Sequence, residues 1–114
     1  MALSPFTKKQ AELKAGAYCE NKIPKQLQNK IRIYYKLRGN NITIFESRPF
    51  YDDPKEWSHM KIAQLRYDNN INEWSLYCAD RNEKWHYHID SEPTKNIEDL
   101  LKDIEEDPTG IFWG

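Results

Sequence analysis

The stretch IRIYYKLRGNNITIFESR, residues 31–48, decides the fold. Apolar and polar residues alternate along residues 31–38, and side chains two residues apart on a strand lie on the same face of a sheet. The tripeptide Gly39-Asn40-Asn41 follows, and glycine and asparagine tolerate the backbone angles of a tight turn. Residues 42–48 then read as the returning strand, which Pro49 closes because it has no N–H to donate to a strand ladder. The stretch therefore predicts a β-hairpin.

Three further strands are predicted between this hairpin and residue 89. Residues 59–67, 74–79 and 84–89 alternate in the same way, and turn-forming Asp and Asn residues separate them. Short turns between successive strands produce an antiparallel meander, here with four or five strands. The alternation puts these residues of the last three strands on the inward face: Ala63, Leu65, Tyr67, Trp74, Leu76, Cys78, Trp85, Tyr87 and Ile89.

A helix is predicted before the strands and another after them. Ser4 or Thr7 caps the first helix, which ends near Asn21 because Pro24 disfavours helical geometry in the residue before it. Apolar residues at helical spacing predict the second helix, which Pro108 stops. The predicted helix contacts with the sheet are Leu13, Ala17, Ile97, Leu100, Leu101 and Ile104. The fold class is thus a single α+β domain of 114 residues: an N-terminal helix, an antiparallel meander and a C-terminal helix packed on the sheet.

Charge is distributed unevenly along the chain, although the net charge is only −1. Residues 1–38 carry nine Lys or Arg against two acids, whereas residues 90–107 carry eight acids against two Lys. Either the two ends pack near each other or remain solvated, or the basic end forms a surface for an acidic partner. The net charge near zero does not favour a polyanion as partner.

The sequence has no apolar run long enough to span a bilayer and no signal-peptide pattern, so we expect a cytoplasmic protein without a membrane partner. Cys19 and Cys78 lack the CxxC spacing of redox or metal motifs. Two reduced thiols are the simpler expectation, and a disulfide is the alternative. We predict no cofactor.

The polar face of the predicted sheet is the main candidate binding surface. By alternation it presents Arg32, Tyr34, Lys36, Arg38, Thr43, Phe45, Gln64, Arg66, Tyr77, His86 and His88. Basic residues interleaved with aromatic rings are typical of sheets that bind single-stranded nucleic acid, because bases stack on rings while Lys and Arg meet phosphates. The alternative is that one helix covers this face and turns its aromatic residues into a second core.

Two other segments hold aromatic residues. Residues 49–57 form a long hairpin loop with three aromatic side chains, which either pack on one another or belong to the partner surface. The chain ends in Ile111-Phe112-Trp113-Gly114, and an exposed apolar tail of this kind favours aggregation. We therefore expect Phe112 and Trp113 to pack against the rest of the domain.

Few residues suggest chemistry. His86 and His88 share a predicted strand face with Asp90, which makes them weak candidates for metal ligands. Asp80 and Arg81 lie in a predicted turn, where they either bind a phosphate and act in acid–base chemistry or simply shape the turn through local hydrogen bonds.

Several short motifs of the chain resemble motifs of a known protein family. They are Arg38-Gly39-Asn40, Glu46-Ser47-Arg48-Pro49, Trp74-x-Leu76-Tyr77, Asp80-Arg81-Asn82-x-x-Trp85 and Asp107-Pro108-Thr109-Gly110-Ile111-Phe112-Trp113-Gly114. From about residue 23 to the end, the chain resembles the bacterial "domain of unknown function 3024" family. The resemblance implies a small stand-alone bacterial protein and transfers no catalytic residue. The chain departs from the family's pattern at Phe50 and Cys78, which we interpret as packing changes.

The sequence predicts a small bacterial binding or regulatory protein without catalysis. Its partner is a protein or a nucleic acid, with a protein slightly favoured because the net charge is near zero. It is a monomer or a homodimer that pairs through edge strands. The predicted binding residues are Arg32, Tyr34, Lys36, Arg38, Phe45, Arg66, Tyr77, Asp80 and Arg81. The alternative is an enzyme acting on a phosphate-containing substrate, with or without a metal, through Asp80, Arg81, His86 and His88.

Overall fold

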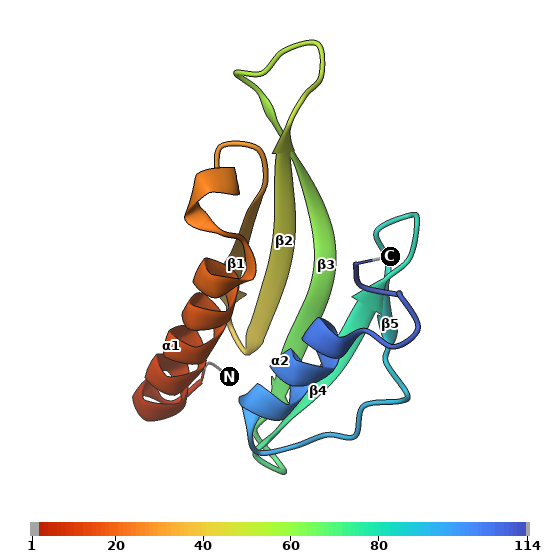
Figure 1. Cartoon of the computed structure of the whole chain (residues 1–114). Coiled ribbons are helices and arrows are strands. Elements are labelled where there is room, and N and C mark those ends of the chain that lie inside the picture. The colour runs from red at the N-terminus through yellow and green to blue at the C-terminus, as the bar shows by residue number, and fades with distance from the viewer. Residues whose placement is uncertain (1–2, 114) are drawn as a thin grey trace.

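The computed structural model describes residues 3–113 and confirms the predicted α+β architecture (Figure 1). Its elements, in chain order, are α1 (Pro5–Lys22), the 3-10 turn η1 (Lys25–Leu27), β1 (Arg32–Arg38), β2 (Asn41–Pro49), β3 (Trp57–Asp68), β4 (Glu73–Ala79), β5 (Trp85–Tyr87) and α2 (Ile97–Glu106). The predicted meander is present with five strands in the order β1-β2-β3-β4-β5, and each neighbouring pair is antiparallel.

A β-bulge interrupts the pairing of β2 with β3. Ile44 pairs with Ala63 and the next residue, Phe45, pairs with Lys61, so Ile62 is the extra residue on β3. Both Ile62 and Ala63 are buried, which strict alternation does not allow. A bulge of this kind bends the strand and shifts its side chains by one position. Beyond it, the β2–β3 hairpin extends past the rest of the sheet (Figure 1).

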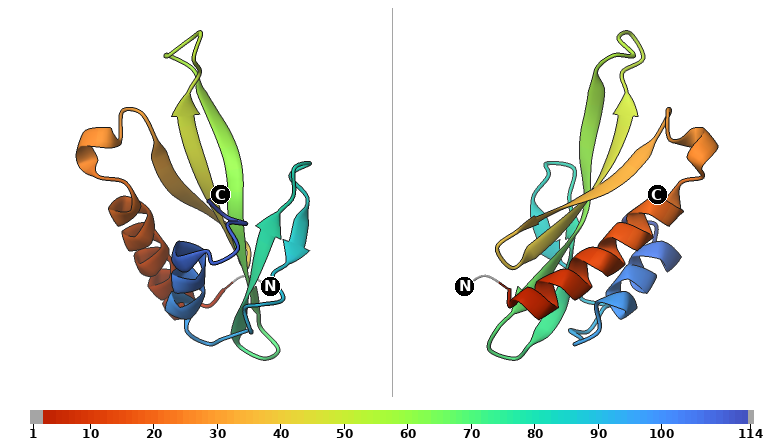
Figure 2. Two further views of the ribbon diagram at one scale, coloured as in Figure 1. Left: turned by 45° about the vertical axis from the view of Figure 1, so that its right-hand side comes forward. Right: turned by 90° about the vertical axis from the view of Figure 1, so that its left-hand side faces the viewer.

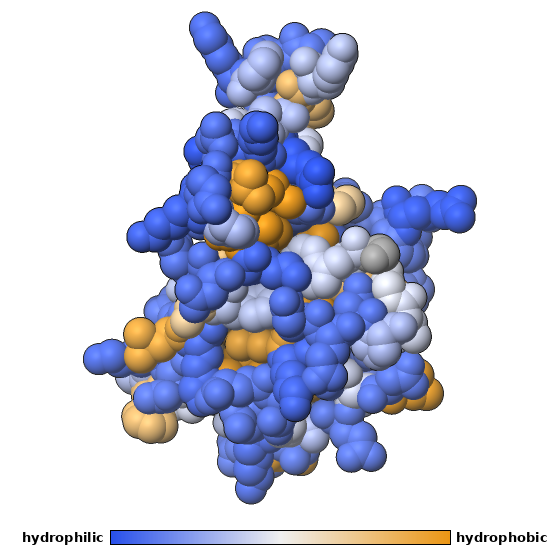
Figure 3. Space-filling view, in the orientation of Figure 1, coloured by the Kyte–Doolittle hydropathy of each residue, from blue (hydrophilic) through white to orange (hydrophobic). Residues whose placement is uncertain are grey.

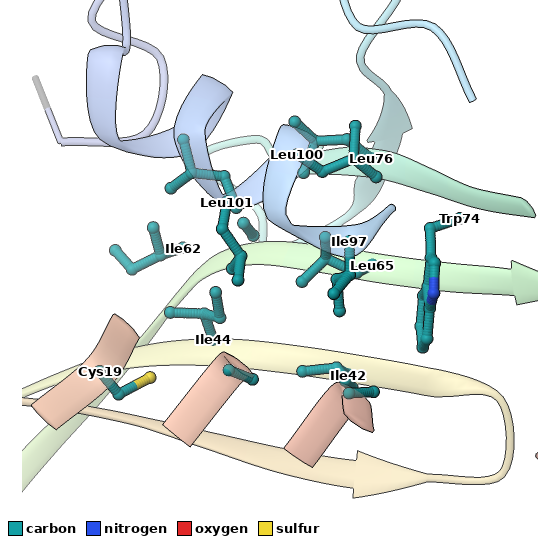
Figure 4. Packing of buried hydrophobic residues seen from close by; sticks show 14 of the residues in the cluster. Cys19, Ile42, Ile44, Ile62, Leu65, Trp74, Leu76, Ile97, Leu100 and Leu101 are labelled. Atoms are coloured by element: carbon teal, nitrogen blue, oxygen red, sulfur yellow. The ribbon is translucent and has the colours of Figure 1, made fainter. Parts of the chain in front are cut away.

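Both helices pack on the same face of the sheet (Figure 2). One hydrophobic core fills the space between them and the strands, and Figure 4 shows its central residues. The largest fully buried side chains are Ile42, Ile44, Leu65, Leu76, Leu100 and Ile104. Within residues 3–113, no helix lies on the opposite face of the sheet, so the interpretation in which a helix covers the polar face is wrong.

The predicted contact stripe of α1 is wrong. Ala11, Ala15 and Cys19 face the core, whereas Leu13 is 59% exposed and Ala17 is also exposed. The stripe of small residues lets α1 pack directly on β1. A Cβ added at Gly16 would lie 3.5 Å from a ring carbon of Tyr35 on β1, which is van der Waals contact. Leu13 and Ala17 instead line a shallow groove of about 650 Å³ between the helices, where Figure 3 shows hydrophobic surface. The predicted α2 contacts are all buried.

Ion pairs join the basic helix α1 to the acidic helix α2. Lys14 pairs with Glu98, and Lys22 Nζ lies 2.7 Å from Glu105 Oε1. Burial raises the pKa of Glu105, but the hydrogen bonds from Lys22 and Tyr18 outweigh it and the net shift is downward. The basic first helix therefore supplies cations to the acidic second helix, as the first of the two charge interpretations expects.

The C-terminal tail folds back, as predicted, around one carboxylate. Asp107 adopts the left-handed conformation (φ 40°) that ends α2. Its Oδ1 and Oδ2 accept hydrogen bonds from the backbone N–H groups of Phe112 (3.1 Å) and Trp113 (2.7 Å). The Trp113 indole N–H donates to the Ile104 carbonyl oxygen, and Phe112 is buried in the core. Gly114 lies outside the described residues.

Candidate functional site

The uncovered face of the sheet carries a continuous set of basic and aromatic side chains. The strand register places them together: Tyr34 pairs with Phe45, Phe45 with Lys61, and Tyr77 with Tyr87. We call this surface the open face. By the strand register it comprises Arg32, Tyr34, Lys36, Arg38, Asn41, Thr43, Phe45, Ser47, Pro49, Trp57, His59, Lys61, Gln64, Arg66, Asp68, Glu73, Ser75, Tyr77, Ala79, Trp85 and Tyr87.

Four cations of the open face lie over aromatic rings of the same face. The guanidinium carbon of Arg66 lies 3.9 Å from the ring centroid of Tyr77, and that of Arg32 lies 4.1 Å from the ring of Trp57. Two lysines do the same at longer range: Lys36 Nζ lies 5.7 Å from the Phe45 ring and Lys61 Nζ lies 5.9 Å from the Trp85 ring. Each such pair contributes about 0.5–1 kcal/mol at an exposed site. The pairs hold the long basic side chains flat on the sheet.

Hydrogen bonds fix the orientation of the two arginines. Arg66 Nε donates to Gln64 Oε1 (2.7 Å), and Gln64 Nε2 donates to Thr43 Oγ1 (3.0 Å), so a chain of three side chains spans β2 and β3. Gln64 is buried, which ties its amide to these two partners. Arg32 Nε donates to the Gln28 carbonyl oxygen (2.9 Å). Both guanidinium groups are therefore positioned before any ligand arrives.

Aromatic contacts continue the surface across β1 and β3. The rings of Tyr34 and Phe45 stack with centroids 5.1 Å apart and planes 12° apart. The Tyr34 hydroxyl lies 2.8 Å from His59 Nδ1, and partial burial raises the pKa of this tyrosine. On β4 and β5, Tyr77 and Tyr87 meet edge to face at 5.6 Å. Aromatic rings are thus distributed over the open face from β1 to β5.

The open face is positively charged although the whole chain is nearly neutral. Its cations are Arg32, Lys36, Arg38, Lys61 and Arg66. Among the described strand residues, the acids on this side are Asp68 and Glu73, which pair with each other at one end of β3 and β4. The net charge of −1 therefore does not describe this surface.

Two hollows lie within the open face, and a third, of about 630 Å³, lies at its edge, where Arg32, Tyr34, Trp57 and His59 meet Glu20 and Glu56. The central hollow, of about 340 Å³, is lined by Lys36, Arg38, Asn41, Thr43, Phe45, Lys61, Gln64 and Trp85. The second, of about 490 Å³, lies beside the β3–β4 turn and includes Arg66 and Tyr77. The lining of the central hollow holds three cations and two aromatic rings and no acid.

Sequence alternation missed several open-face residues for two local reasons. The bulge at Ile62 moves Trp57, His59 and Lys61 to the open face, and no sequence signal marks this bulge. On β5, Trp85 pairs with Ala79 across a five-residue turn, whereas a four-residue turn was expected. One extra turn residue shifts the register by one and reverses the face of every β5 side chain.

The prediction that His86 and His88 lie on the polar face, with Trp85, Tyr87 and Ile89 inward, is therefore wrong. His86 pairs with Cys78 on the helix side, while Ile89 is exposed. His88 Nδ1 lies 2.9 Å from Ser91 Oγ, and the His88 ring packs against the ring of Phe112. Within residues 3–113, no group of three or more His, Cys, Asp or Glu side chains is arranged to hold a metal ion.

Asp80 shapes the β4–β5 turn. Its Oδ1 accepts hydrogen bonds from the backbone N–H groups of Asn82 (2.8 Å) and Lys84 (3.0 Å), and its Oδ2 lies 2.7 Å from His86 Nε2. The bond with His86 and those two backbone bonds lower the pKa of Asp80 to about 2. Arg81 is exposed in the same turn. The structure pairs Asp80 with His86 and His88 with Ser91, so the residues of the enzymatic alternative do not share one set of contacts.

This geometry predicts a pH-dependent contribution of Asp80 to stability. Because its folded pKa is lowered from the ordinary 3.8 to about 2, the contribution is complete above about pH 4 and disappears as the pH falls toward 2. We expect the melting temperature of Asp80→Asn to lie below that of the wild type at pH 7 and to converge with it between pH 4 and pH 2. Thermal unfolding followed by circular dichroism at several pH values measures this. The exposed loop variant Asp52→Asn is the control and should match the wild type throughout; a gap for Asp80→Asn that persists at pH 2 would contradict the assignment.

The β2–β3 loop presents aromatic residues to solvent. Tyr51 is fully exposed and Phe50 is about half exposed, so the loop does not form a small core of its own. Trp57, at the start of β3, instead lies under Arg32 on the open face. Of the two interpretations of this segment, internal packing is thus excluded for Tyr51.

The two cysteines are free and buried. Burial raises the pKa of the Cys19 thiol to about 12 and also raises the pKa of the Cys78 thiol. Both effects disfavour the thiolate, which is the nucleophilic form. Neither cysteine is therefore part of a candidate reactive site.

A family model described as "Domain of unknown function (DUF3024)" matches residues 3–114. The chain belongs to this family. The match covers nearly the whole DUF3024 chain and so includes both helices, all five strands and the open face. Comparison with curated proteins and with solved structures gave no match. In the described part of this DUF3024 chain, no helix has the length and apolar character needed to cross a membrane.

Proposed function

We propose that this DUF3024 protein is a non-catalytic binding module whose open face takes single-stranded nucleic acid. The observation that carries the proposal is the set of four cation–aromatic pairs on a sheet face that no helix covers. Proteins that bind single strands combine a positive surface for the phosphates with aromatic rings on which bases stack. Bases also stack on guanidinium planes, so Arg66 over Tyr77 is itself a stacking platform.

The distribution of charge favours a nucleic acid over a protein partner. The sequence favoured a protein only because the net charge is near zero, and that balance includes the acids of α2. Two of those acids, Glu98 and Glu105, pair with lysines of α1 on the helix side. Among the described strand residues, the acids on the side of the five open-face cations are Asp68 and Glu73, at the end of the surface, and outside the strands Glu20 and Glu56 line a hollow beside Arg32. A polyanion would therefore meet a net positive field there.

We further propose that the module acts in the bacterial cytoplasm, where its two free, buried thiols remain reduced. The homodimer alternative stays a prediction: β1 and β5 are the two edge strands of the sheet, and each leaves backbone groups for pairing with another copy.

Removing single cations of the open face tests the proposal. Fluorescence anisotropy with labelled single-stranded RNA and DNA of about ten nucleotides, at salt concentrations from about 50 to 200 mM, measures affinity and its salt dependence. We expect Lys36→Ala and Arg66→Ala each to weaken binding and to lower the salt slope by about 0.7, the value for one phosphate contact on a single strand. The unfolding free energy should change little for Lys36→Ala because Lys36 is exposed, whereas Arg66→Ala should also lower it by about 1–3 kcal/mol because the buried Gln64 amide loses a hydrogen-bond partner.

The matched control is Lys9→Ala, which removes the same charge from the exposed side of α1. It should leave the affinity and the salt slope close to those of the wild type. Equal losses in Lys9→Ala and Lys36→Ala would show a non-specific charge effect and would contradict the open-face site. Failure of the wild type to bind any single strand at low salt would overturn the proposal.

A further inference from the structure

The central hollow of the open face has the composition of a nucleotide pocket. Its volume of about 340 Å³ lies within the range of small-ligand sites. Phe45 comes from β2 and Trp85 from β5, and Lys36, Arg38 and Lys61 are its cations. We infer that this hollow binds one nucleoside 5′-monophosphate unit, with the base stacked on the aromatic rings and the phosphate on the cations. The inference deepens the proposed function and rests on it.

The position of Trp85 is what makes the hollow. Trp85 pairs with Ala79 on β4, and this register places the indole on the open face. The ring lies close enough to β3 for Lys61 Nζ to be 5.9 Å from its centroid. On the opposite side, Lys36 Nζ is 5.7 Å from the Phe45 ring. Each ring thus has an ammonium group near it, and because Phe45 also stacks on Tyr34, Trp85 offers the ring for the base while the ammonium groups meet the phosphate.

The neutral residues of the hollow are arranged for a polar ligand as well. The hydrogen bonds of Gln64 to Thr43 and Arg66 use its amide group and hold its side chain in place. Asn41 adds an amide at the edge of the hollow. Ring faces, fixed polar groups and three cations therefore converge on one concave site, whereas a flat binding surface would need only the rings and the charges.

Calorimetric titration with adenosine 5′-monophosphate, adenosine and inorganic phosphate tests the inference on the intact protein. We expect saturable binding of the monophosphate that is at least about tenfold tighter than that of adenosine or phosphate alone, because only the monophosphate engages rings and cations together. Trp85→Ala should weaken monophosphate binding about tenfold, and Lys61→Ala should also weaken it. Phe6→Ala, which removes an exposed ring from α1 on the helix side, should have no effect.

The outcomes separate the inference from the proposed function. Monophosphate binding no tighter than phosphate binding, or equal in the wild type, Trp85→Ala and Lys61→Ala, would overturn the pocket. If the same protein still binds a single-stranded oligonucleotide, the open-face function stands without a defined pocket. If neither the monophosphate nor the oligonucleotide binds, both fail. Circular dichroism checks that each variant is folded. If Trp85→Ala does not fold, Lys61→Ala still tests the pocket.

Discussion

Replacing Asp107 with alanine should destabilise the protein by about 3 kcal/mol. The Asp107 carboxylate accepts two backbone hydrogen bonds, from Phe112 and Trp113, and bonds to charged groups contribute about 1.5–3 kcal/mol each without being fully additive. Asp107 also has φ 40°, and alanine is strained in this left-handed conformation. Loss of the carboxylate releases the tail and exposes Phe112, which is otherwise buried. Urea unfolding gives the change in free energy.

Two variants make the Asp107 experiment specific. Asp107→Asn keeps one acceptor oxygen and tolerates the left-handed conformation, so it should lose about half as much stability as Asp107→Ala. Glu106→Ala removes the neighbouring exposed acid and should change the free energy of unfolding by less than about 0.5 kcal/mol. If Asp107→Ala and Glu106→Ala unfold alike, the carboxylate does not hold the tail.

Enlarging Ala15 should be the second strongly destabilising change. Ala15 is fully buried where α1 packs on the sheet, and extra methyl and methylene groups in a packed core cost about 1–3 kcal/mol. Ala15→Leu must move α1 away from β1 or force neighbouring side chains from their preferred rotamers. We expect a lower unfolding free energy in urea, with the secondary structure retained.

Ala17→Leu is a matched control for Ala15→Leu. The substitution is identical, the two positions lie on the same helix, and Ala17 is exposed. Its effect should stay within about 0.5 kcal/mol. The pair also distinguishes two orientations of α1, because the sequence alone predicts that Ala17 faces the sheet. A larger loss for Ala17→Leu than for Ala15→Leu would reverse the orientation described above.

The sequence predicts the strands well because their alternation has one strong solution. In residues 31–38, Ile and Leu occupy one parity and charged residues the other, and a slip by one residue would expose the whole apolar set. The same argument predicts α2, whose four apolar residues are all buried. For α1 the same argument predicts the wrong buried face, because it assigns large apolar residues to the core. Leu13 suggested the buried stripe, but close packing on β1 selects the small Ala11 and Ala15.

The face on which the candidate residues lie was predicted most accurately where the strand register is uninterrupted. Arg32, Tyr34, Lys36, Arg38, Phe45, Arg66 and Tyr77 share the open face, as expected from β1–β4. Asp80 and Arg81 lie in the adjoining turn, where Asp80 has a structural role. Trp85 was assigned to the wrong face, since its position depends on the length of that turn. Lys61 depends on a bulge that the residue types do not mark.

The division of the sheet into two faces connects the fold to the proposed function. The helix side uses its polar residues for folding, in the ion pairs of α1 with α2 and in the Asp107 contacts with the tail. On the open side, the basic and aromatic residues stabilise little beyond one another, and the core would form without them. Open-face variants should therefore change binding more than stability, in contrast to changes at Ala15 or Asp107.

The most direct test of the open-face account is nuclear magnetic resonance of isotope-labelled protein titrated with a single-stranded oligonucleotide. The account predicts saturable shifts of the backbone and aromatic signals of β1 to β5, largest around the central hollow at Phe45, Lys61 and Trp85. Signals on the exposed side of α1 and α2 should not move. Shifts confined to the helix side, or no shifts at low salt, would contradict the claim that the open face binds nucleic acid.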